Sequence, residues 1–531
     1  MNIRFLNHEM SSVHAAAFLL GAAGLFSRLV GVVRDRLLAS HFGAGRELDI
    51  YYAAFQIPDL MSVVFLLGAG SAAILPVFQE YLAGDRASAR RLISQISTLF
   101  LFGALGGVAL VFMLAPWLVR LAVPGFSPAD QALTVTLMRI MLCSPVLFGL
   151  SSIFSAVIQS FERFLAYAAA PIFYNLGIIA GILFFAPVWG VAGLAAGVAL
   201  GAGLHMAIQY VSLSSLGFAP RLAVRPIDRG LKKIVALSAP RVLSLSFTQL
   251  TVLVLTALAS MLPSGSISVF QFSQNLYFVP VGVFGVSYSV ALFPRLSAAY
   301  IERNPDRFFQ EFFLGIRSIL FWAVPSAMLF FVLRIEIVRV VLGSRAFTWE
   351  NMQLTAACLG MLAIAIIAAS LMPHIVKSFY ALENTRVPLL VDMGGSIVSV
   401  VLAFVFTKLI SPPVLGIALG FSLGLAVNAL LLYIVLVPFA VRVFGKPVRS
   451  GSAVGRPVLK IVAASLVAGI AAYAVRISFP EVTPYGSAIP VLAHGLLAGT
   501  VGLLVYAGLL TLLKSEDVGI LRLSMQKRFF R

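Results

Sequence analysis

Several ionisable side chains lie inside stretches of sequence that are otherwise apolar. Arg28, Arg34 and Asp35 lie in the first such stretch, Asp59 lies in the second, and Asp392 lies in a later one. A charged side chain inside a bilayer is costly, so it usually binds a substrate or an ion, or pairs with another charge. Arginine presents a planar fork of N–H donors that matches the oxygens of a phosphate. One chemistry open to these residues is therefore the binding of an anionic ligand that carries phosphate.

The first stretch allows two interpretations. Arg28 and Asp35 are separated by two helical turns and share one stripe of a helix, while Arg34 lies about 120° around from Arg28. Arg28 also lies about 22 Å along the helix, too deep to reach the near interface easily. Either an Arg28–Asp35 ion pair holds this helix against its neighbours, or the stripe lines a cleft and presents guanidinium groups to a ligand.

The two other acids are also open to alternatives. Asp59 follows Pro58, and a proline inside a helix frees a carbonyl group and usually bends the helix. Asp59 can therefore face a cleft, or it can pair with one of the arginines. Asp392 has no basic residue within a helical turn or two, since Arg386 lies near the end of its stretch. It is either a site for a proton or sodium ion or a neutral, hydrogen-bonded carboxyl group.

The sequence lacks the patterns of covalent catalysis and of metal binding. It contains no nucleophile grouped with a base and an acid, no Walker-type phosphate loop and no paired carboxylates. Its 6 histidines are scattered without metal-ligand spacing. We therefore expect a protein that binds and moves its ligand, not an enzyme, and we expect neither a metal site nor a cofactor.

The composition places the chain in a membrane. Of its 531 residues 60% are hydrophobic and only 11% are charged, with a mean hydropathy of +1.01. A water-soluble chain carries about 25% charged residues, and only helices or closed barrels span a bilayer. No alternation typical of a barrel is present, so we predict an all-α polytopic membrane protein with about fourteen transmembrane helices. The expected spans are 13–40, 50–78, 92–114, 132–160, 164–187, 189–212, 233–262, 266–294, 309–333, 351–379, 386–408, 412–440, 457–478 and 488–513.

The net charge of +18 is a topology signal. Most of the 38 Lys and Arg residues fall in the termini and in the loops that lie on the same side as the termini. By the positive-inside rule both termini are then cytoplasmic, and the basic loops meet anionic lipid headgroups rather than nucleic acid. The tail at 514–531 is basic and amphipathic, and we expect it to lie on the inner leaflet.

The chain is internally duplicated with a shift of about 220 residues. We predict two lobes of six helices, 1–220 and 221–440, facing each other across a cleft and related by a pseudo-twofold axis along the membrane normal, with two additional helices in 441–513. Small residues spaced by four suit close helix contacts, so we expect packing seams at the repeated glycines. These glycines are Gly193, Gly197 and Gly201 in one repeat and Gly416, Gly420 and Gly424 in the other.

Motifs in both repeats resemble the lipid II flippase family MurJ/MviN of the multidrug/oligosaccharidyl-lipid/polysaccharide exporter superfamily. The number of expected spans also agrees with that family. The motifs are SRLVGVVRD (27–35), FGAG (42–45), LDIYYAAFQIPDL (48–60), Pro76, GVFGVSYSVALFPRLS (282–297) and SFYALENTRVP (378–388).

The resemblance implies a flippase of the bacterial inner membrane. Such a protein moves undecaprenyl-pyrophosphate-linked peptidoglycan precursor, lipid II, from the cytoplasmic to the periplasmic leaflet by alternating access. The lobes would rock about a cationic cavity, and the helices in 441–513 would form a groove for the lipid tail. We expect a monomer that associates with membrane lipids and with the cell-wall synthesis machinery. Coupling to sodium, to protons or to the membrane potential stays open.

The resemblance also suggests site residues and exposes departures. Arg28, Arg34, Asp35 and Asp49 match the family's cavity-lining or essential positions. Where the family has further charges this chain has uncharged residues, which leaves the headgroup that it binds open. These departures are Ser62, Val63, Leu67 and Asn275. The full set of substrate-binding candidates is Arg28, Arg34, Asp35, Asp49, Asp59 and Asn275, and the ion-coupling candidate is Asp392.

Two other functions compete with this one. A related exporter of another polyprenyl-linked glycan or of drugs would share the fold. A drug antiporter, however, should have twelve spans and a cavity whose main charged groups are carboxylates. A scaffold that does not transport would keep the fold and use its cytoplasmic loops to bind partners. The lost charges favour the scaffold, and the retained Arg28 and Arg34 favour a flippase.

Overall fold

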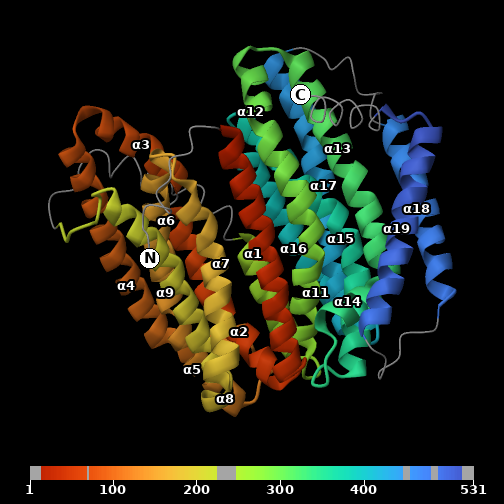
Figure 1. Ribbon diagram of the computed structural model, residues 1–531, viewed down its shortest axis with the longest axis horizontal. Coiled ribbons are helices and arrows are strands. Elements are labelled where there is room, and N and C mark those ends of the chain that lie inside the picture. The colour runs from red at the N-terminus through yellow and green to blue at the C-terminus, as the bar shows by residue number, and fades with distance from the viewer. Residues whose placement is uncertain (1–12, 69–70, 224–246, 446–454, 480–487, 517–531) are drawn as a thin grey trace. The chain divides into compact units, whose positions relative to one another are not determined.

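The computed structural model describes residues 13–68, 71–223, 247–445, 455–479 and 488–516. Within these ranges the secondary structure is helical and contains no strand, which confirms the predicted all-α class (Figure 1). The chain forms two compact units, Met1–Ser268 and Val269–Arg531. The boundaries that we expected at residues 220 and 440 stay predictions.

The first unit begins with two helices that contribute the candidate site, α1 and α2. Its α7 continues without a break through a π-helical segment, η1, into α8. Within the unit, α2 packs on α5 and α6, while α7 packs on α1 and α9. The elements are α1 (Val13–Phe42), α2 (Arg46–Gly68), α3 (Ser71–Gly84), α4 (Arg86–Ala122), α5 (Pro128–Met141), α6 (Cys143–Ser160), α7 (Phe164–Ala180), η1 (Gly181–Phe185), α8 (Ala186–Trp189), α9 (Val191–Ser215) and a shorter helix, Phe247–Ser260.

The second unit repeats the pattern of long apolar helices and adds a C-terminal pair. Here α17 packs on both α15 and α16, and the pair α18 and α19 packs on α13 and α14. The elements are α11 (Ser266–Pro280, which begins in the first unit), η2 (Val281–Val286), α12 (Ser287–Ile301), α13 (Pro305–Val332), α14 (Arg334–Leu342), α15 (Trp349–Ala381), α16 (Arg386–Leu409), α17 (Val414–Phe444), α18 (Gly455–Ile477) and α19 (Ala488–Leu512).

Eleven helical segments of the described chain are long and apolar enough to cross a membrane. They coincide with the third to sixth and the eighth to fourteenth predicted spans. The described parts of the second predicted span, 50–78, lie in α2 and α3, and the described part of the seventh is the shorter helix Phe247–Ser260. The total of fourteen spans therefore stays a prediction.

Polar residues in the loops determine where several of these helices begin. The carboxylate of Asp85 accepts hydrogen bonds from the backbone N–H groups of Ala87 and Ser88, which start α4. These bonds hold the pKa of the Asp85 carboxyl below its ordinary value. Ser127 and Asn304 cap α5 and α13 in the same way. Each cap satisfies a backbone donor that the helix itself leaves free.

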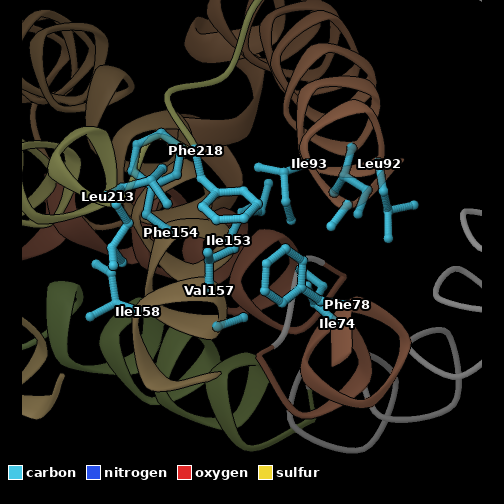
Figure 2. Close-up of a cluster of buried hydrophobic side chains, with 14 of the residues drawn as sticks. Ile74, Phe78, Leu92, Ile93, Ile153, Phe154, Val157, Ile158, Leu213 and Phe218 are labelled. Carbon is cyan, nitrogen blue, oxygen red and sulfur yellow. The ribbon is translucent and has the colours of Figure 1, made fainter. Parts of the chain in front are cut away.

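A cluster of buried apolar side chains holds α3, α4 and α6 to the end of α9 (Figure 2). Phe78 of α3 and Phe218, which follows α9, pack edge to face with their ring centroids 5.4 Å apart. Leu92, Ile93, Ile153 and Val157 surround them. This cluster fixes one end of the first unit.

The repeated glycines are packing seams, as predicted. A Cβ atom at Gly201 of α9 would lie 2.4 Å from the carbonyl oxygen of Tyr174 in α7. A Cβ atom at Gly420 of α17 would lie 2.2 Å from the backbone nitrogen of Ala403 in α16. Side chains at these positions would force the paired helices apart. The same device therefore occurs once in each unit, as the duplication predicts.

Candidate functional site

The guanidinium group of Arg34 joins α1 to α7. Its Nε and Nη2 atoms donate to Oδ1 of Asp35 over 3.0 and 2.7 Å, and its Nη1 atom donates to Oδ1 of Asn175 over 3.1 Å. Asp35 and Asn175 are both buried, and the side chain of Arg34 is 22% exposed. The pair that we considered between Arg28 and Asp35 is not formed, because the long side chain of Arg34 folds onto its neighbour instead. Arg34 is thereby held in one orientation.

Residues of α2 complete the surroundings of Arg34. Tyr51 and Tyr52 are buried and lie within electrostatic range of Arg34 and Asp35. Asp59 lies two turns further along α2, also within electrostatic range of Arg34, and its side chain is exposed. It makes no ion pair with any arginine in the described ranges. The structure thus brings Arg34, Asp35 and Asp59 together and leaves Asp59 open.

Arg28 is the second candidate arginine of α1. It lies six residues before Arg34, it is partly exposed, and it has no hydrogen bond or ion pair within the described part of the chain. Its N–H donors are therefore available to a ligand. The candidates of α1 and α2 described so far are thus two cations and two anions, of which Arg28 and Asp59 form no ion pair with a described residue.

Asp49 makes its hydrogen bonds within the protein, so its predicted contact with substrate stays a prediction. Its carboxylate is buried and accepts hydrogen bonds from the backbone N–H groups of Gly265 and Ser268, over 2.6 and 2.7 Å, and from Oγ of Ser268 over 2.6 Å. Gly265 has a φ of +94°, and a Cβ atom there would lie 2.5 Å from the carbonyl oxygen of Ala44. Asp49 therefore holds α2 against the start of α11, and a direct contact with substrate is not supported.

The candidates of the second unit are hydrogen-bonded. Oδ1 of Asn275 accepts a hydrogen bond from Gln271 one turn earlier in α11, over 3.3 Å. Oδ1 of Asp392 accepts a hydrogen bond of 3.0 Å from Nδ2 of Asn428, which is buried in α17. Asp392 is therefore not isolated in the bilayer. Its role in ion coupling stays a prediction.

The residues that depart from the family pattern in α2 are uncharged in this chain. Ser62 is buried, and its hydroxyl group donates to the carbonyl oxygen of Pro58 in its own helix over 2.8 Å. Val63 is apolar, and the side chain of Leu67 lies outside the described part of the structure. The first unit therefore offers Arg28 and Arg34 as the arginines of this site.

Sequence reasoning missed Asn175, which orients Arg34. A signal was present, because Asn175 occupies the same position in its repeat that Asp392 occupies in the other. The two motifs are Pro171, Asn175 and Gly177 in α7 and Pro388, Asp392 and Gly394 in α16. A polar residue at the matching position of both repeats marks a place where an intramembrane contact is needed.

Comparisons with known proteins show which family the chain resembles. "Lipid II flippase MurJ" from Burkholderia cenocepacia is 28% identical over 419 residues, which cover 77% of this chain and 81% of that protein. A solved structure described as "Lipid II flippase MurJ, inward closed conformation" has a TM-score of 0.77 and 22% identity, and the match covers 94% of this chain and all of the other.

Multidrug transporters share the fold at a greater distance. An inward-facing multidrug resistance MATE family transporter of the MOP superfamily has a TM-score of 0.66 and 14% identity, with 78% of this chain and 95% of that chain covered.

The family model for "Lipid II flippase MurJ" matches residues 38–493, which is most of the sequence. The chain therefore belongs to the lipid II flippase MurJ family.

Proposed function

We propose that this protein is a lipid II flippase that moves the undecaprenyl-pyrophosphate-linked precursor of peptidoglycan from the cytoplasmic to the periplasmic leaflet of the inner membrane. Membership of the family over residues 38–493 supports this function. The structural observation that carries it is the pair of arginines on α1. Arg34 is held in place by Asp35 and Asn175, and Arg28 has no hydrogen-bond or ion-pair partner among the described residues.

The two arginines have complementary tasks in binding the headgroup. Arg34 is oriented in advance, so little conformational entropy is lost when a phosphate oxygen approaches it. Arg28 has all of its donors available and can engage a phosphate in bidentate geometry. The pyrophosphate is the part of the substrate that these groups recognise, and α1 carries both of them.

Asp59 gives the site a means of releasing its ligand. Its carboxylate lies within range of Arg34 and has no partner of its own in the described chain, so it competes with phosphate for the guanidinium. Proton uptake by Asp59 would raise the charge of the group by one and favour the bound headgroup. Proton loss would favour its departure.

Transport by alternating access needs no covalent step, so we propose a transporter without catalytic activity or cofactor. A pyrophosphate with about two negative charges gains roughly 5 kcal/mol per 100 mV when it moves outward across an inside-negative membrane. Return of the empty carrier needs a counter-ion, and Asp392 with Asn428 is our candidate for a proton or sodium site. Oδ1 of Asn428 is buried without a hydrogen-bond partner in the described chain, so it can add an oxygen ligand to the Asp392 carboxylate.

We further propose that the protein acts as a monomer with both termini in the cytoplasm, next to the enzymes of cell-wall synthesis. A second function deserves a test because Ser62 and Asn275 are uncharged where the family has charges. A related exporter that carries another polyprenyl-linked glycan would tolerate this loss, since part of the headgroup contact would differ. The two functions predict different substrates for the same arginines.

The test combines rescue of cells with transport by the purified protein. A bacterium depleted of its own lipid II flippase receives the wild-type chain, Arg28→Ala, Arg28→Lys or the control Arg36→Ala, an exposed arginine of the same helix. We expect wild type and Arg36→Ala to restore growth and outer-leaflet lipid II, Arg28→Ala to fail, and Arg28→Lys to restore them partly because it keeps the charge without the fork.

Two results would argue against this function. Equal rescue by Arg28→Ala and wild type would show that the arginine does not bind the headgroup. Failure of the wild-type chain to move lipid II in proteoliposomes, combined with movement of another polyprenyl-pyrophosphate glycan, would favour the related exporter. A scaffold would move neither lipid in proteoliposomes and would restore growth in none of the four forms.

A further inference from the structure

A separate group of charged side chains lies in the second unit, where α14 begins and α18 ends. Nε of Arg476 donates to Oε1 of Glu336 over 2.6 Å, and the Glu336 side chain is 6% exposed. Gly495 of α19 lies against the aliphatic stem of the same side chain, since a Cβ atom there would be 3.3 Å from Cβ of Glu336. This buried ion pair attaches the C-terminal pair α18 and α19 to α14, next to which α19 runs (Figure 1).

Arg334 lies beside this pair without an acid of its own. Its guanidinium group packs over the ring of Phe331 at 5.0 Å, and its Nη1 atom donates to the carbonyl oxygen of Phe331 over 2.7 Å. Gly360 of α15 makes room for its aliphatic stem, because a Cβ atom there would lie 3.0 Å from Cδ of Arg334. An arginine has five N–H donors, and those of Arg334 make no other hydrogen bond within the described part of the chain.

The charge balance of this group favours an anion. Arg334 and Arg476 are two cations, and Glu336, already engaged by Arg476, is the acid paired with them. Burial, and then the positive charge of Arg476, lower the pKa of Arg334 from its ordinary value. Among the described residues this group has a net charge of +1, and its half-buried guanidinium would be stabilised by a ligand that carries one negative charge.

The surroundings indicate that this anion is part of a lipid. Phe331 and Tyr473 are each 49% exposed beside Arg334, and Ile477 and Ile489 are exposed at the ends of α18 and α19. Aromatic side chains beside a basic residue at the end of apolar helices are typical of the level of the lipid headgroups. The distribution of basic loops predicts that this end of the unit faces outward.

We propose that Arg334, with Arg476 behind it, binds the phosphate of an anionic phospholipid in the outer leaflet and so attaches the C-terminal helices to the surrounding bilayer. A phosphodiester carries a single negative charge, which matches the excess charge of the group. The aromatic and apolar rim favours a lipid over free phosphate. This site is independent of the transported substrate, because it concerns the bilayer lipid and not lipid II.

The experiment uses the full-length protein in nanodiscs of dioleoylphosphatidylglycerol or of dioleoylphosphatidylcholine, and in detergent with inorganic phosphate. Lipid retention is measured by native mass spectrometry and stability by thermal unfolding. We expect Arg334→Gln to bind phosphatidylglycerol about tenfold more weakly, a factor that corresponds to about 1.4 kcal/mol, and to lose the rise in Tm that this lipid causes. The control Lys408→Gln, an exposed lysine at the end of α16, should retain both.

The following results of this experiment would contradict the proposal. Equal phosphatidylglycerol binding by wild type and Arg334→Gln would exclude the arginine as the ligand. An equal rise in Tm with inorganic phosphate or with phosphatidylcholine would exclude an anionic lipid as the occupant. If Arg334→Gln does not fold, Arg334→Met provides the test, because it keeps an apolar stem and removes the guanidinium group. Unchanged lipid binding by that variant would also overturn the proposal.

Discussion

Asp49 provides a direct test of whether a buried acid of the family pattern is structural. Its carboxylate receives three donors: the backbone N–H groups of Gly265 and Ser268 and the hydroxyl group of Ser268. In Asp49→Ala both backbone donors lose their acceptor. A buried donor left without a partner costs about 1–3 kcal/mol. We therefore expect Asp49→Ala to lower the free energy of unfolding by about 2–6 kcal/mol.

Two other substitutions should destabilise the protein less than Asp49→Ala does. Asp49→Asn keeps the oxygen that faces Ser268 but turns an amide N–H₂ toward the N–H of Gly265, so one donor is lost at about 1–3 kcal/mol. Ser268→Ala removes only the hydroxyl bond, which contributes about 1 kcal/mol. The expected order of destabilisation is Asp49→Ala, then Asp49→Asn, then Ser268→Ala.

Stability is measured by unfolding the purified protein in mixed micelles titrated with SDS. Lipid II binding is measured separately on the folded fraction. A structural Asp49 lowers stability in the stated order and leaves the lipid II affinity of the folded protein within about twofold of wild type. The opposite result, wild-type stability of Asp49→Ala with a large loss of lipid II affinity, would refute the reasoning and restore Asp49 as a substrate contact.

Three further predictions follow from other parts of the structure. Gly201→Ala should lower thermal stability and transport because its Cβ atom would lie 2.4 Å from a carbonyl oxygen of α7, whereas Gly203→Ala, with no atom within 4 Å, should behave as wild type; equal behaviour of the two would rule out a packing seam. Asp392→Asn should remove the dependence of flipping on an imposed sodium or proton gradient in proteoliposomes, and an unchanged dependence would exclude Asp392 as the coupling site. Because hydrogen bonds depress the pKa of Asp85, its contribution to stability is present above the unfolded pKa and is lost as pH falls through the folded value. The hydrogen-exchange protection factor at the start of α4, which corrects for the intrinsic pH dependence of exchange, should therefore fall at acidic pH in wild type and show no such fall in Asp85→Ala.

Local sequence was sufficient for the features that depend on local physics. An apolar run must form its own backbone hydrogen bonds in lipid, so the helices are predictable wherever the run is continuous. Ser127, Asn304 and Asp85 mark helix starts because they bond to a backbone only a few residues away. The glycine repeats likewise predicted the packing seams of α9 and α17, since a residue without a side chain allows two backbones to approach.

The sequence by itself determined that this protein spans a membrane with helices and that arginines lie within one of them. Only the tertiary structure decided what each charge does. Arg34 donates to Asn175 of another helix, 141 positions away, and Asp49 bonds to residues more than two hundred positions away. Such partners depend on which helices pack together, and packing is set by the sum of many contacts along the chain. The spacing of charges within one helix cannot reveal it.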